Sequence, residues 1–379
     1  MKRICFVATV PVAIHVFLRE SIKASAKKWA VSVITTPDDD DLLCDMNAHL
    51  IPVTIKRKAA PLHDIFSLLR LLLIFRTSHF DMVHSITPKA GLLSMFAAWL
   101  AKVPVRIHTF TGQVWATKKG LKRNTLKVFD KIIIYFSTHV LVDSPSQYDF
   151  LVEEGVLPKG KGLVIGHGSI CGVDEHRFHP NPQIRDALRA ELRISAEQIV
   201  ILYLGRLNRD KGILDLAKAF SLIAEQRADV VLVMVGAEED VAFSQVQEAC
   251  GAHSSKLRRV DFTNSPERYM AAADILCLPS YREGFGQVII EAAACGIPSV
   301  ASNIYGVKDA INDGESGLLF PPKDYQELTL SLLKLINNEE LRQSIGAMAR
   351  TRALELFSSK NIVNNVLILY GDLLDSEQS

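Results

Sequence analysis

The chain has 379 residues, which is too long for one ordinary domain and comfortable for two. Its hydrophobic content of 48% and charged content of 22% indicate a soluble globular protein with a full core. The net charge of +1 hides an asymmetry, because residues 1–180 carry 23 Lys and Arg against 15 Asp and Glu, whereas the remainder carries 20 against 27. A basic half joined to an acidic half suggests that the first half faces something anionic.

Six scattered cysteines form no C-x-x-C pair and have no metal-ligand spacing. This pattern favours reduced thiols in the cytosol over a zinc site or a disulfide framework. Neither a metal nor a cofactor is expected for this chain. An aspartate run at 38–41 is more typical of a solvated loop than of a metal site, since no other ligand-type residue has a suitable spacing.

Two apolar segments in the first 75 residues could be mistaken for a signal peptide or a transmembrane helix. Ile4–Val10 follows Lys2 and Arg3, as in a signal peptide, but polar residues and Pro11 interrupt the run and no cleavage site follows. A first buried strand is favoured. Leu68–Phe75 is too short to span a bilayer, so we predict no transmembrane helix.

Short apolar runs alternate with helical patterns along both halves of the chain. Strands are expected in the first half at 4–8, 31–35, 82–84, 105–109, 140–142 and 163–165, with helices at about 13–28, 62–76, 89–101, 119–136 and 145–154. Strands are expected in the second half at 199–204, 230–235, 257–260, 275–278 and 299–301, and late helices at 339–356 and 362–374. Residues 174–198 have the composition of a connection. This alternation predicts two α/β domains with parallel sheets, in which ligands bind beyond the carboxyl ends of the strands.

The most informative stretch is 274–299, where an apolar strand leads through a glycine-containing turn into a helix. Glu283 lies on the turn, and Glu291 lies one turn inside the helix. Gly284 and Gly286 allow backbone N–H groups to approach a ligand closely, and a helix N-terminus favours an anion. Two carboxylates around such a turn suit a ligand with hydroxyls on both sides of a phosphate, such as a nucleotide sugar.

This stretch resembles the E-x7-E motif of retaining glycosyltransferase family 4, with Glu283 and Glu291 as its glutamates. Arg206 and Lys211, near the end of the strand at 199–204, are similar to the family's Gly-Arg-x5-Lys-Gly element, although only four residues separate them here. An Arg fork and a Lys point charge suit a diphosphate. His108, which closes a strand of the first half, corresponds by resemblance to a histidine that faces the donor sugar.

The first strand–loop–helix departs from the family. Many members carry a Gly-Gly pair there, whereas this chain has Thr9-Val10-Pro11-Val12-Ala13. In this respect the chain looks more like the branch that acts on lipid-linked saccharides in surface-polymer assembly, including capsule and lipopolysaccharide. Basic and apolar residues between Lys118 and Lys131 favour an anionic membrane surface, although a solvated helix face is the alternative. Nucleic acid is not expected as a partner.

The resemblance implies the GT-B architecture, with two Rossmann-like domains that face each other across a cleft and a last helix that crosses back onto the first domain. We expect an acceptor domain at 1–177 plus about 360–379, and a donor domain at 178–359. The expected catalytic residues are His108, Glu283, Arg206 and Lys211, and the expected donor-binding residues are Arg206, Lys211, Glu283, Gly284, Phe285, Gly286 and Glu291.

The predicted activity is a retaining, metal-independent transfer of an N-acetylhexosamine or hexose from a UDP-sugar to a polyprenyl-diphosphate-linked saccharide. The enzyme would act in the cytoplasm at the inner face of the cell membrane. A GDP-sugar, a soluble acceptor and a nucleotide-sugar epimerase remain alternatives. A nicotinamide dehydrogenase is disfavoured because Gly-x-Gly-x-x-Gly is missing after the first strand, and a non-catalytic scaffold because all four motif residues are present.

Overall fold

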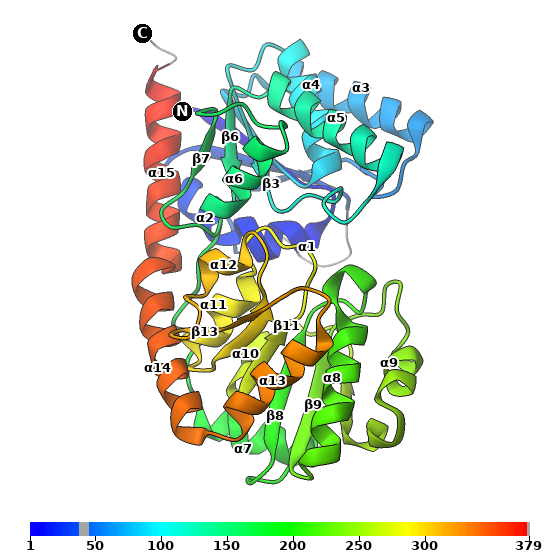
Figure 1. Ribbon diagram of the computed structural model, residues 1–379. Coiled ribbons are helices and arrows are strands. Elements are labelled where there is room, and N and C mark those ends of the chain that lie inside the picture. Colours follow the sequence, from blue (N-terminus) through cyan, green and yellow to red (C-terminus); the bar gives the residue numbers. More distant parts are fainter. Residues whose placement is uncertain (38–44, 377–379) are drawn as a thin grey trace. The chain divides into compact units, whose positions relative to one another are not determined.

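The computed structural model describes residues 1–37 and 45–376 and consists of two compact units (Figure 1). Unit 1 comprises Met1–Gly172 and Ser359–Ser379, and unit 2 comprises Val173–Ser358. The junction after Gly172 lies close to the domain boundary expected after residue 177, and the last helix belongs to unit 1. The aspartate run at 38–41 lies outside the described residues.

Unit 1 is built on a parallel sheet of seven strands in the order β3-β2-β1-β4-β5-β6-β7. The strands are β1 (Arg3–Val7), β2 (Ala30–Thr35), β3 (His49–Pro52), β4 (Met82–Ile86), β5 (Val105–Phe110), β6 (His139–Val142) and β7 (Gly162–Val164). The sequence did not predict β3, which is an edge strand of four residues with no internal alternation to mark it. The apolar run in β1 pairs with β2 and β4 on either side, as expected for a buried parallel strand.

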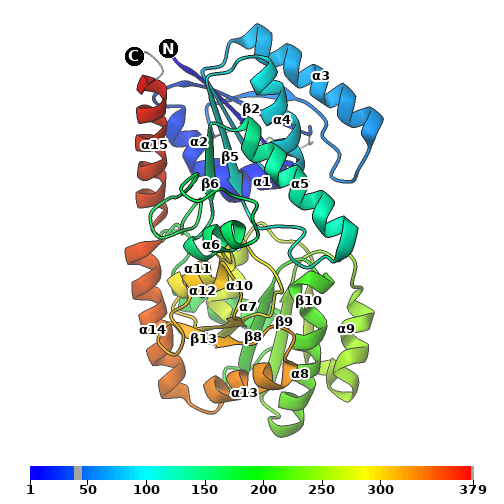
Figure 2. The same cartoon turned by 45° about the horizontal axis from the view of Figure 1, so that its top comes forward.

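Helices cover both faces of this sheet. One face packs against α3 (Pro61–Ser78), α4 (Pro88–Leu100), α5 (Gly120–Phe136) and α6 (Pro145–Glu153). Figures 1 and 2 show α3, α4 and α5 side by side on this face. The other face packs against a helical segment at the start of the chain and α15 (Ser359–Ser376). Both apolar faces of the sheet are therefore buried.

The first helical segment differs from the single helix expected at 13–28. It consists of α1 (Pro11–Ala13), a π-helical turn η1 (Ile14–Leu18) and α2 (Arg19–Ser25). The η1 run Ile-His-Val-Phe-Leu is rich in β-branched and aromatic residues, which have lower helix propensity than the residues of α2. Ile14, Leu18 and Ile22 still reach the core of unit 1.

Unit 2 repeats the plan with a six-stranded parallel sheet in the order β10-β9-β8-β11-β12-β13. The strands are β8 (Ile199–Leu204), β9 (Val230–Val235), β10 (Leu257–Val260), β11 (Ile275–Leu278), β12 (Ser299–Ser302) and β13 (Gly317–Phe320). The helices are α7 (Pro182–Glu191), η2 (Arg209–Lys211), α8 (Ile213–Gln226), α9 (Phe243–Cys250), η3 (Gly251–Lys256), α10 (Pro266–Ala272), α11 (Gln287–Ala294), α12 (Val307–Ala310), α13 (Tyr325–Ile336) and α14 (Glu339–Leu356). The sequence analysis predicted α14 but neither β13 nor α13.

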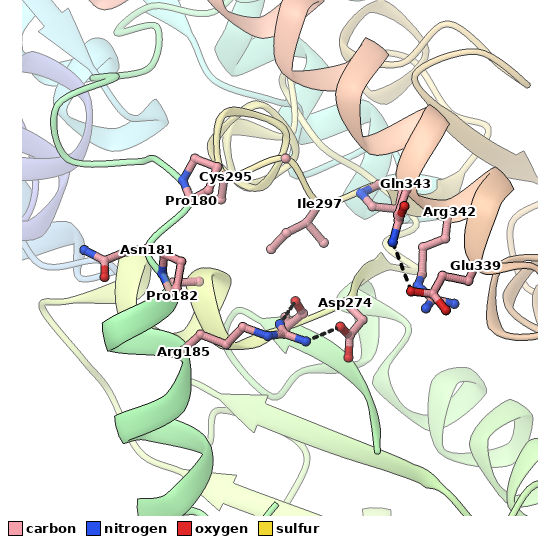
Figure 3. A pocket seen from close by; sticks show the side chains of 14 residues that line it. Pro180, Asn181, Pro182, Arg185, Asp274, Cys295, Ile297, Glu339, Arg342 and Gln343 are labelled. Carbon is pink, nitrogen blue, oxygen red and sulfur yellow. Dashed lines mark hydrogen bonds and ion pairs between the residues drawn. The ribbon is translucent and has the colours of Figure 1, made fainter. Parts of the chain in front are cut away.

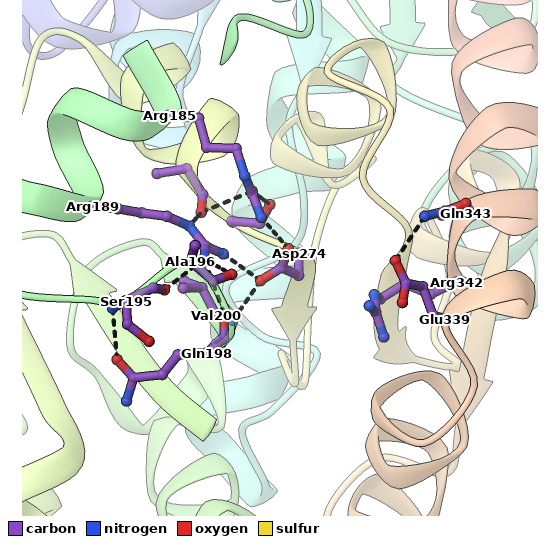
Figure 4. A network of polar contacts seen from close by, with 12 residues as sticks. Arg185, Arg189, Ser195, Ala196, Gln198, Val200, Asp274, Glu339, Arg342 and Gln343 are labelled. Atoms are coloured by element: carbon purple, nitrogen blue, oxygen red, sulfur yellow. Dashed lines mark hydrogen bonds and ion pairs between the residues drawn. The ribbon is translucent and has the colours of Figure 1, made fainter. Parts of the chain in front are cut away.

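The interpretation of 174–198 as a plain connection is wrong, because α7 lies within it. Asn181 accepts a hydrogen bond from the Ile184 amide, and Pro182 occupies the first turn (Figure 3). The buried Arg189 and the neighbouring Arg185 each donate to a different oxygen of Asp274 at 2.6 Å (Figure 4). These ion pairs hold α7 against unit 2. The polar residues that made this segment resemble a linker therefore include those that cap α7 and bind it to the rest of unit 2.

In each sheet the chain order reverses at one place, between β1 and β4 in unit 1 and between β8 and β11 in unit 2. In doubly wound folds, ligands bind beyond the carboxyl edge of the sheet at such a reversal. The loops after β8 and β11 are those that carry the predicted cations and glutamates of unit 2.

The C-terminal helix is attached to unit 1 by a buried hydrogen-bonded chain. The Tyr370 hydroxyl lies 2.5 Å from His84 Nδ1, and His84 Nε2 lies 2.7 Å from the Thr109 hydroxyl. Burial lowers the pKa of His84 to about 3, so the ring is neutral. Its two nitrogens link a residue of α15 to a residue of the sheet by hydrogen bonds.

We predict that Tyr370→Phe lowers the free energy of unfolding by about 1–2 kcal/mol, because it leaves a buried His84 nitrogen without its partner. Chemical denaturation measures the change. Tyr135→Phe is the control, since Tyr135 is 73% exposed, and it should unfold like the wild type. Equal stabilities of the two variants would show that the hydrogen bond does not contribute.

Candidate functional site

Arg206 and Lys211 lie on the loop that connects β8 to α8. The Asn208 side chain accepts a hydrogen bond from the Lys211 amide at 3.0 Å and so caps η2. Gly212 then adopts a left-handed conformation and starts α8. This local order directs Lys211 toward the neighbouring loop after β11.

Lys211 and Glu283 form an ion pair, with 2.5 Å between Lys211 Nζ and Glu283 Oε1. Both side chains are mostly buried, so solvent screens this pair less than it would an exposed one. The structure therefore brings together one predicted cation and one predicted glutamate, which the sequence placed 72 residues apart.

Three further contacts join the same two loops. The Tyr281 amide donates to the Asp210 carbonyl at 2.8 Å, and Arg282 Nε donates to the Asp210 carboxylate at 3.0 Å. The Tyr281 hydroxyl donates to Asp215 at 2.6 Å. Burial, and then this bond to a carboxylate, raise the pKa of Tyr281 above its usual range, so the hydroxyl stays protonated. The loops form one hydrogen-bonded body.

Arg206 has a different partner. Its Nη1 lies 2.5 Å from both carboxylate oxygens of Glu239, which follows β9, and Asn208 also donates to Glu239 at 2.6 Å. Neither Glu239 nor Asn208 is among the site residues predicted from the sequence. Their position just beyond β9 and β8 was the available signal, because β9 and β8 are adjacent strands and their loops leave the same edge of the sheet.

The glycine turn leads directly into α11. Gly286 has a φ of +85° at the N-cap and, as a glycine, has no side chain that could cap the helix. Phe285 is buried and stacks edge-to-face on Phe357 at 5.0 Å. Phe285 therefore anchors the turn, and only its backbone is placed to meet a ligand. Gly284, Phe285 and Gly286 together form the predicted anion-binding turn.

Glu291 lies one turn inside α11, as expected from the sequence. Its Oε1 accepts a hydrogen bond from Gln287 at 3.3 Å. Burial raises the pKa of Glu291 to about 7 and Glu267 adds to the rise, while the Gln287 bond and the charge of Arg177 oppose it. The site therefore holds one glutamate with a cationic partner and one with only an amide.

His108 lies inside unit 1. The residue is 1% exposed, and its Nδ1 lies 2.8 Å from the Ser85 hydroxyl. A Cβ atom at Gly91 on α4 would lie 2.5 Å from the same nitrogen, so the ring fills the space above that glycine. Burial, and then the nearby His84, lower the pKa of His108 to about 3. Its contact with a donor sugar stays a prediction, and this burial gives it the least structural support of the candidates.

Other parts of the described chain offer weaker candidates for a site. No group of three His, Cys, Asp or Glu among the described residues could hold a metal ion. A cavity of about 300 Å³ in unit 2 is lined by Asp274 and Pro298, which precede β11 and β12 (Figure 3). It therefore lies at the amino edge of the sheet, opposite the loops above, and Asp274 there is already paired with arginines.

Comparison with known proteins shows the family to which the chain belongs. Residues 184–352 match the family model for glycosyl transferases group 1, and residues 14–168 match that for the glycosyl transferase 4-like domain. The capsular polysaccharide biosynthesis glycosyltransferase CapM of Staphylococcus aureus is 30% identical over 333 residues, which cover 87% of this chain and 86% of CapM. The chain is a family 4 glycosyltransferase. The dehydrogenase, epimerase and scaffold alternatives are thereby set aside.

Further relatives support the same assignment. The Escherichia coli UDP-Gal:alpha-D-GlcNAc-diphosphoundecaprenol alpha-1,3-galactosyltransferase is 25% identical over 347 residues, covering 89% of this glycosyltransferase and 87% of the relative. A sucrose-phosphate synthase structure from Thermosynechococcus elongatus matches with a TM-score of 0.83 and 24% identity, covering 99% and 100% of the two chains. Anabaena Alr3699/HepE in complex with UDP and glucose matches with a TM-score of 0.83 and 20% identity, covering 98% and 100%. These structures show the GT-B fold.

Substitution of Gly212 tests whether close contact between the two loops stabilises the fold. A Cβ atom at this residue would lie 1.9 Å from the Pro279 carbonyl oxygen, so Gly212→Ala must push the β8 and β11 loops apart. We expect it to lower the free energy of unfolding by at least about 2 kcal/mol more than Gly314→Ala. Gly314 is the matched control, because it also has a positive φ but has no atom within 4 Å of a new Cβ. Denaturant unfolding gives both values, and equal losses would contradict the close contact.

The raised pKa of Glu291 predicts a pH-dependent stability. The folded state holds this proton up to about pH 7, whereas a free glutamate releases it near 4.5. The stability from this proton is thus present at low pH and is lost as the pH rises from 4.5 to 7. We expect Glu291→Gln to be more stable than the wild type at pH 8, with a gain that shrinks toward pH 5. Urea denaturation at both values measures it, and a gain that does not change with pH would contradict the assignment.

Proposed function

We propose that this glycosyltransferase transfers a hexose or N-acetylhexosamine from a UDP-sugar to a polyprenyl-diphosphate-linked saccharide during surface-polysaccharide assembly. The observation that carries the proposal is the junction of Lys211, Glu283 and the N-terminus of α11 at the chain reversal in unit 2. A cation, a carboxylate and a helix N-terminus gathered at one such edge suit a sugar attached to a diphosphate.

Each part of the donor is assigned to different residues. Arg206 and Lys211 neutralise the diphosphate leaving group, whose negative charge grows as the glycosidic bond breaks. Glu291 accepts hydrogen bonds from the ribose hydroxyls, and Glu283 with the N–H groups of Gly284–Gly286 holds the sugar. Glu239 and Asn208 orient Arg206 before the donor arrives. His108 supports the reacting face of the sugar.

These roles leave no task for a metal ion, since side chains and a helix end carry the positive charge. We therefore propose that transfer proceeds without a divalent metal and with retention of the anomeric configuration. Glu283 already accepts a hydrogen bond from Lys211 and is assigned to binding, not to covalent attack.

The acceptor is assigned to the basic unit 1. Support comes from the relative whose name contains an undecaprenol-diphosphate acceptor, and from CapM, which is named for capsular polysaccharide biosynthesis. No described helix is long and apolar enough to cross a membrane. We propose that the enzyme reaches a lipid-linked acceptor by binding to the anionic inner surface of the membrane from the cytoplasm.

The donor class is tested by titrating UDP, GDP, ADP and NAD into the wild type in EDTA. UDP alone should bind, and Glu291→Ala should weaken that binding by about 1–3 kcal/mol through lost ribose hydrogen bonds. Glu225→Ala is the control, because Glu225 is exposed on α8 and should leave the affinity unchanged.

Binding of GDP in place of UDP would show that the donor is a GDP-sugar. Binding of NAD, or of no nucleotide, would contradict the proposed donor-binding site. Sugar transfer to a water-soluble acceptor in EDTA then separates metal-independent from metal-dependent chemistry. A strict need for a divalent metal would contradict the assigned roles of Arg206 and Lys211.

A further inference from the structure

Helix α3 is apolar on both of its sides. Leu71 and Phe75 face the core of unit 1, with Leu68, Leu72 and Ile74 packed beside them. The opposite side carries five exposed large apolar residues, Leu62, Ile65, Phe66, Leu69 and Leu73, with exposed fractions from 54% to 77%. A helix on the surface of a globular protein is normally polar on that side.

The five residues form one stripe. Their spacing of i, i+3, i+4, i+7 and i+11 places them along a single side of α3, over about three turns. Scattered exposed apolar residues are common, but a continuous apolar stripe of this size marks an interaction surface. We call these five residues the α3 stripe.

Helix α5 adds to the same region. α3 packs against α4 and α4 packs against α5, and both cartoon views show the three helices together (Figures 1 and 2). Leu121, Val128 and Tyr135 are exposed on α5 and recur every seven residues, so they share one side of that helix. Two helices of unit 1 that pack on either side of α4 thus each carry exposed apolar residues.

The charge around these helices has one sign. Residues 46–136 contain 14 Lys and Arg against three Asp and no Glu, a net of +11. Each Asp is already engaged: Asp64 pairs with Lys89, Asp81 with Lys2, and the buried Asp130 accepts from the Trp115 indole at 2.7 Å. The cations of this segment therefore outnumber its carboxylates more than fourfold.

Not every cation predicted for a membrane surface contributes. Arg123 and Lys127 both pair with Glu154, at 2.7 and 2.9 Å. Lys119, Lys122 and Lys131 are exposed on or beside α5, and Arg70 and Arg76 are exposed on α3 itself. The basic character of α3 is thus combined with the apolar stripe on one helix.

We propose that the α3 stripe inserts among the acyl chains of an anionic phospholipid bilayer, with the surrounding Lys and Arg bound to the lipid headgroups. Charge complementarity selects this partner, because exposed apolar residues accompanied by exposed Lys and Arg match a surface with acyl chains beneath anionic groups. This inference rests on the proposed function, since it identifies the part of unit 1 that would bring the enzyme to a lipid-linked acceptor.

Vesicle flotation tests the proposal with variants that keep the net charge. The wild type should float with vesicles that contain phosphatidylglycerol and bind vesicles of phosphatidylcholine much more weakly. Phe66→Ser with Leu69→Ser should weaken binding to the anionic vesicles by at least about tenfold. Leu330→Ser with Met348→Ser is the matched control, because these exposed apolar residues lie on α13 and α14 of unit 2, and it should stay within about twofold of the wild type.

Fluorescence tests insertion directly. A tryptophan introduced by Phe66→Trp should be quenched by bromine atoms on the acyl chains, whereas one introduced by Leu330→Trp should not. Flotation of the Phe66/Leu69 variant at the wild-type level would overturn the proposal. So would sedimentation of the wild type without lipid as a dimer that this variant abolishes, because the stripe would then be an interface between two copies.

Measurement of UDP binding distinguishes failure of the membrane proposal from failure of the proposed function. UDP affinity, and transfer to a water-soluble acceptor, should be unchanged in the Phe66/Leu69 variant because α3 lies in unit 1 and the candidate donor site in unit 2. Vesicle binding without UDP binding would support the membrane surface and contradict the donor. UDP binding without vesicle binding would contradict the membrane surface alone.

Discussion

The close approach of Gly212 to the Pro279 carbonyl is the contact on which the candidate site depends. It brings the loop after β8 against the loop after β11, at the point where the order of the strands reverses. Only a residue without a Cβ atom fits there. The backbone therefore fixes the distance that Lys211 has to span to reach Glu283, and the side chains are in place before a ligand arrives. Such preorganisation reduces the ordering cost that binding would otherwise incur.

The two glutamates of the motif are held in different ways, and the difference has a chemical use. Glu283 has a cation beside it, so its charge is balanced within the protein. Glu291 accepts a hydrogen bond from the Gln287 amide, and burial raises its pKa to about 7. A carboxylate that is costly to ionise in the folded protein gains most from a ligand that donates hydrogen bonds to it. A raised pKa in a buried carboxyl group is common at binding sites, and Glu291 is a candidate of that kind.

Much of the fold could be predicted from the sequence because buried parallel strands are short apolar runs between helical patterns. Strands β8, β9, β10 and β11 have the predicted bounds, and so does α14. Strand β3 and helix α7 were missed for a physical reason, since their stability comes from tertiary partners. Glu239 was missed likewise, because its role depends on which strands are neighbours. The burial of His108 depends on Gly91 and Ser85, which lie far from it in sequence.

The sequence also could not reveal the α3 stripe, because composition reports how apolar a helix is but not which side faces the core. The apolar run of α3 is too short for a helix that crosses a bilayer, but a helix of this length can lie on the surface of one. The two substrates of the proposed reaction make the distinction matter. A nucleotide sugar is dissolved in water, whereas a polyprenyl-linked acceptor is confined to the bilayer. An enzyme that binds the surface through unit 1 meets its acceptor at the effective concentration of a two-dimensional phase. The distribution of charge agrees with this division, since the basic residues are concentrated in the half of the chain that carries the stripe.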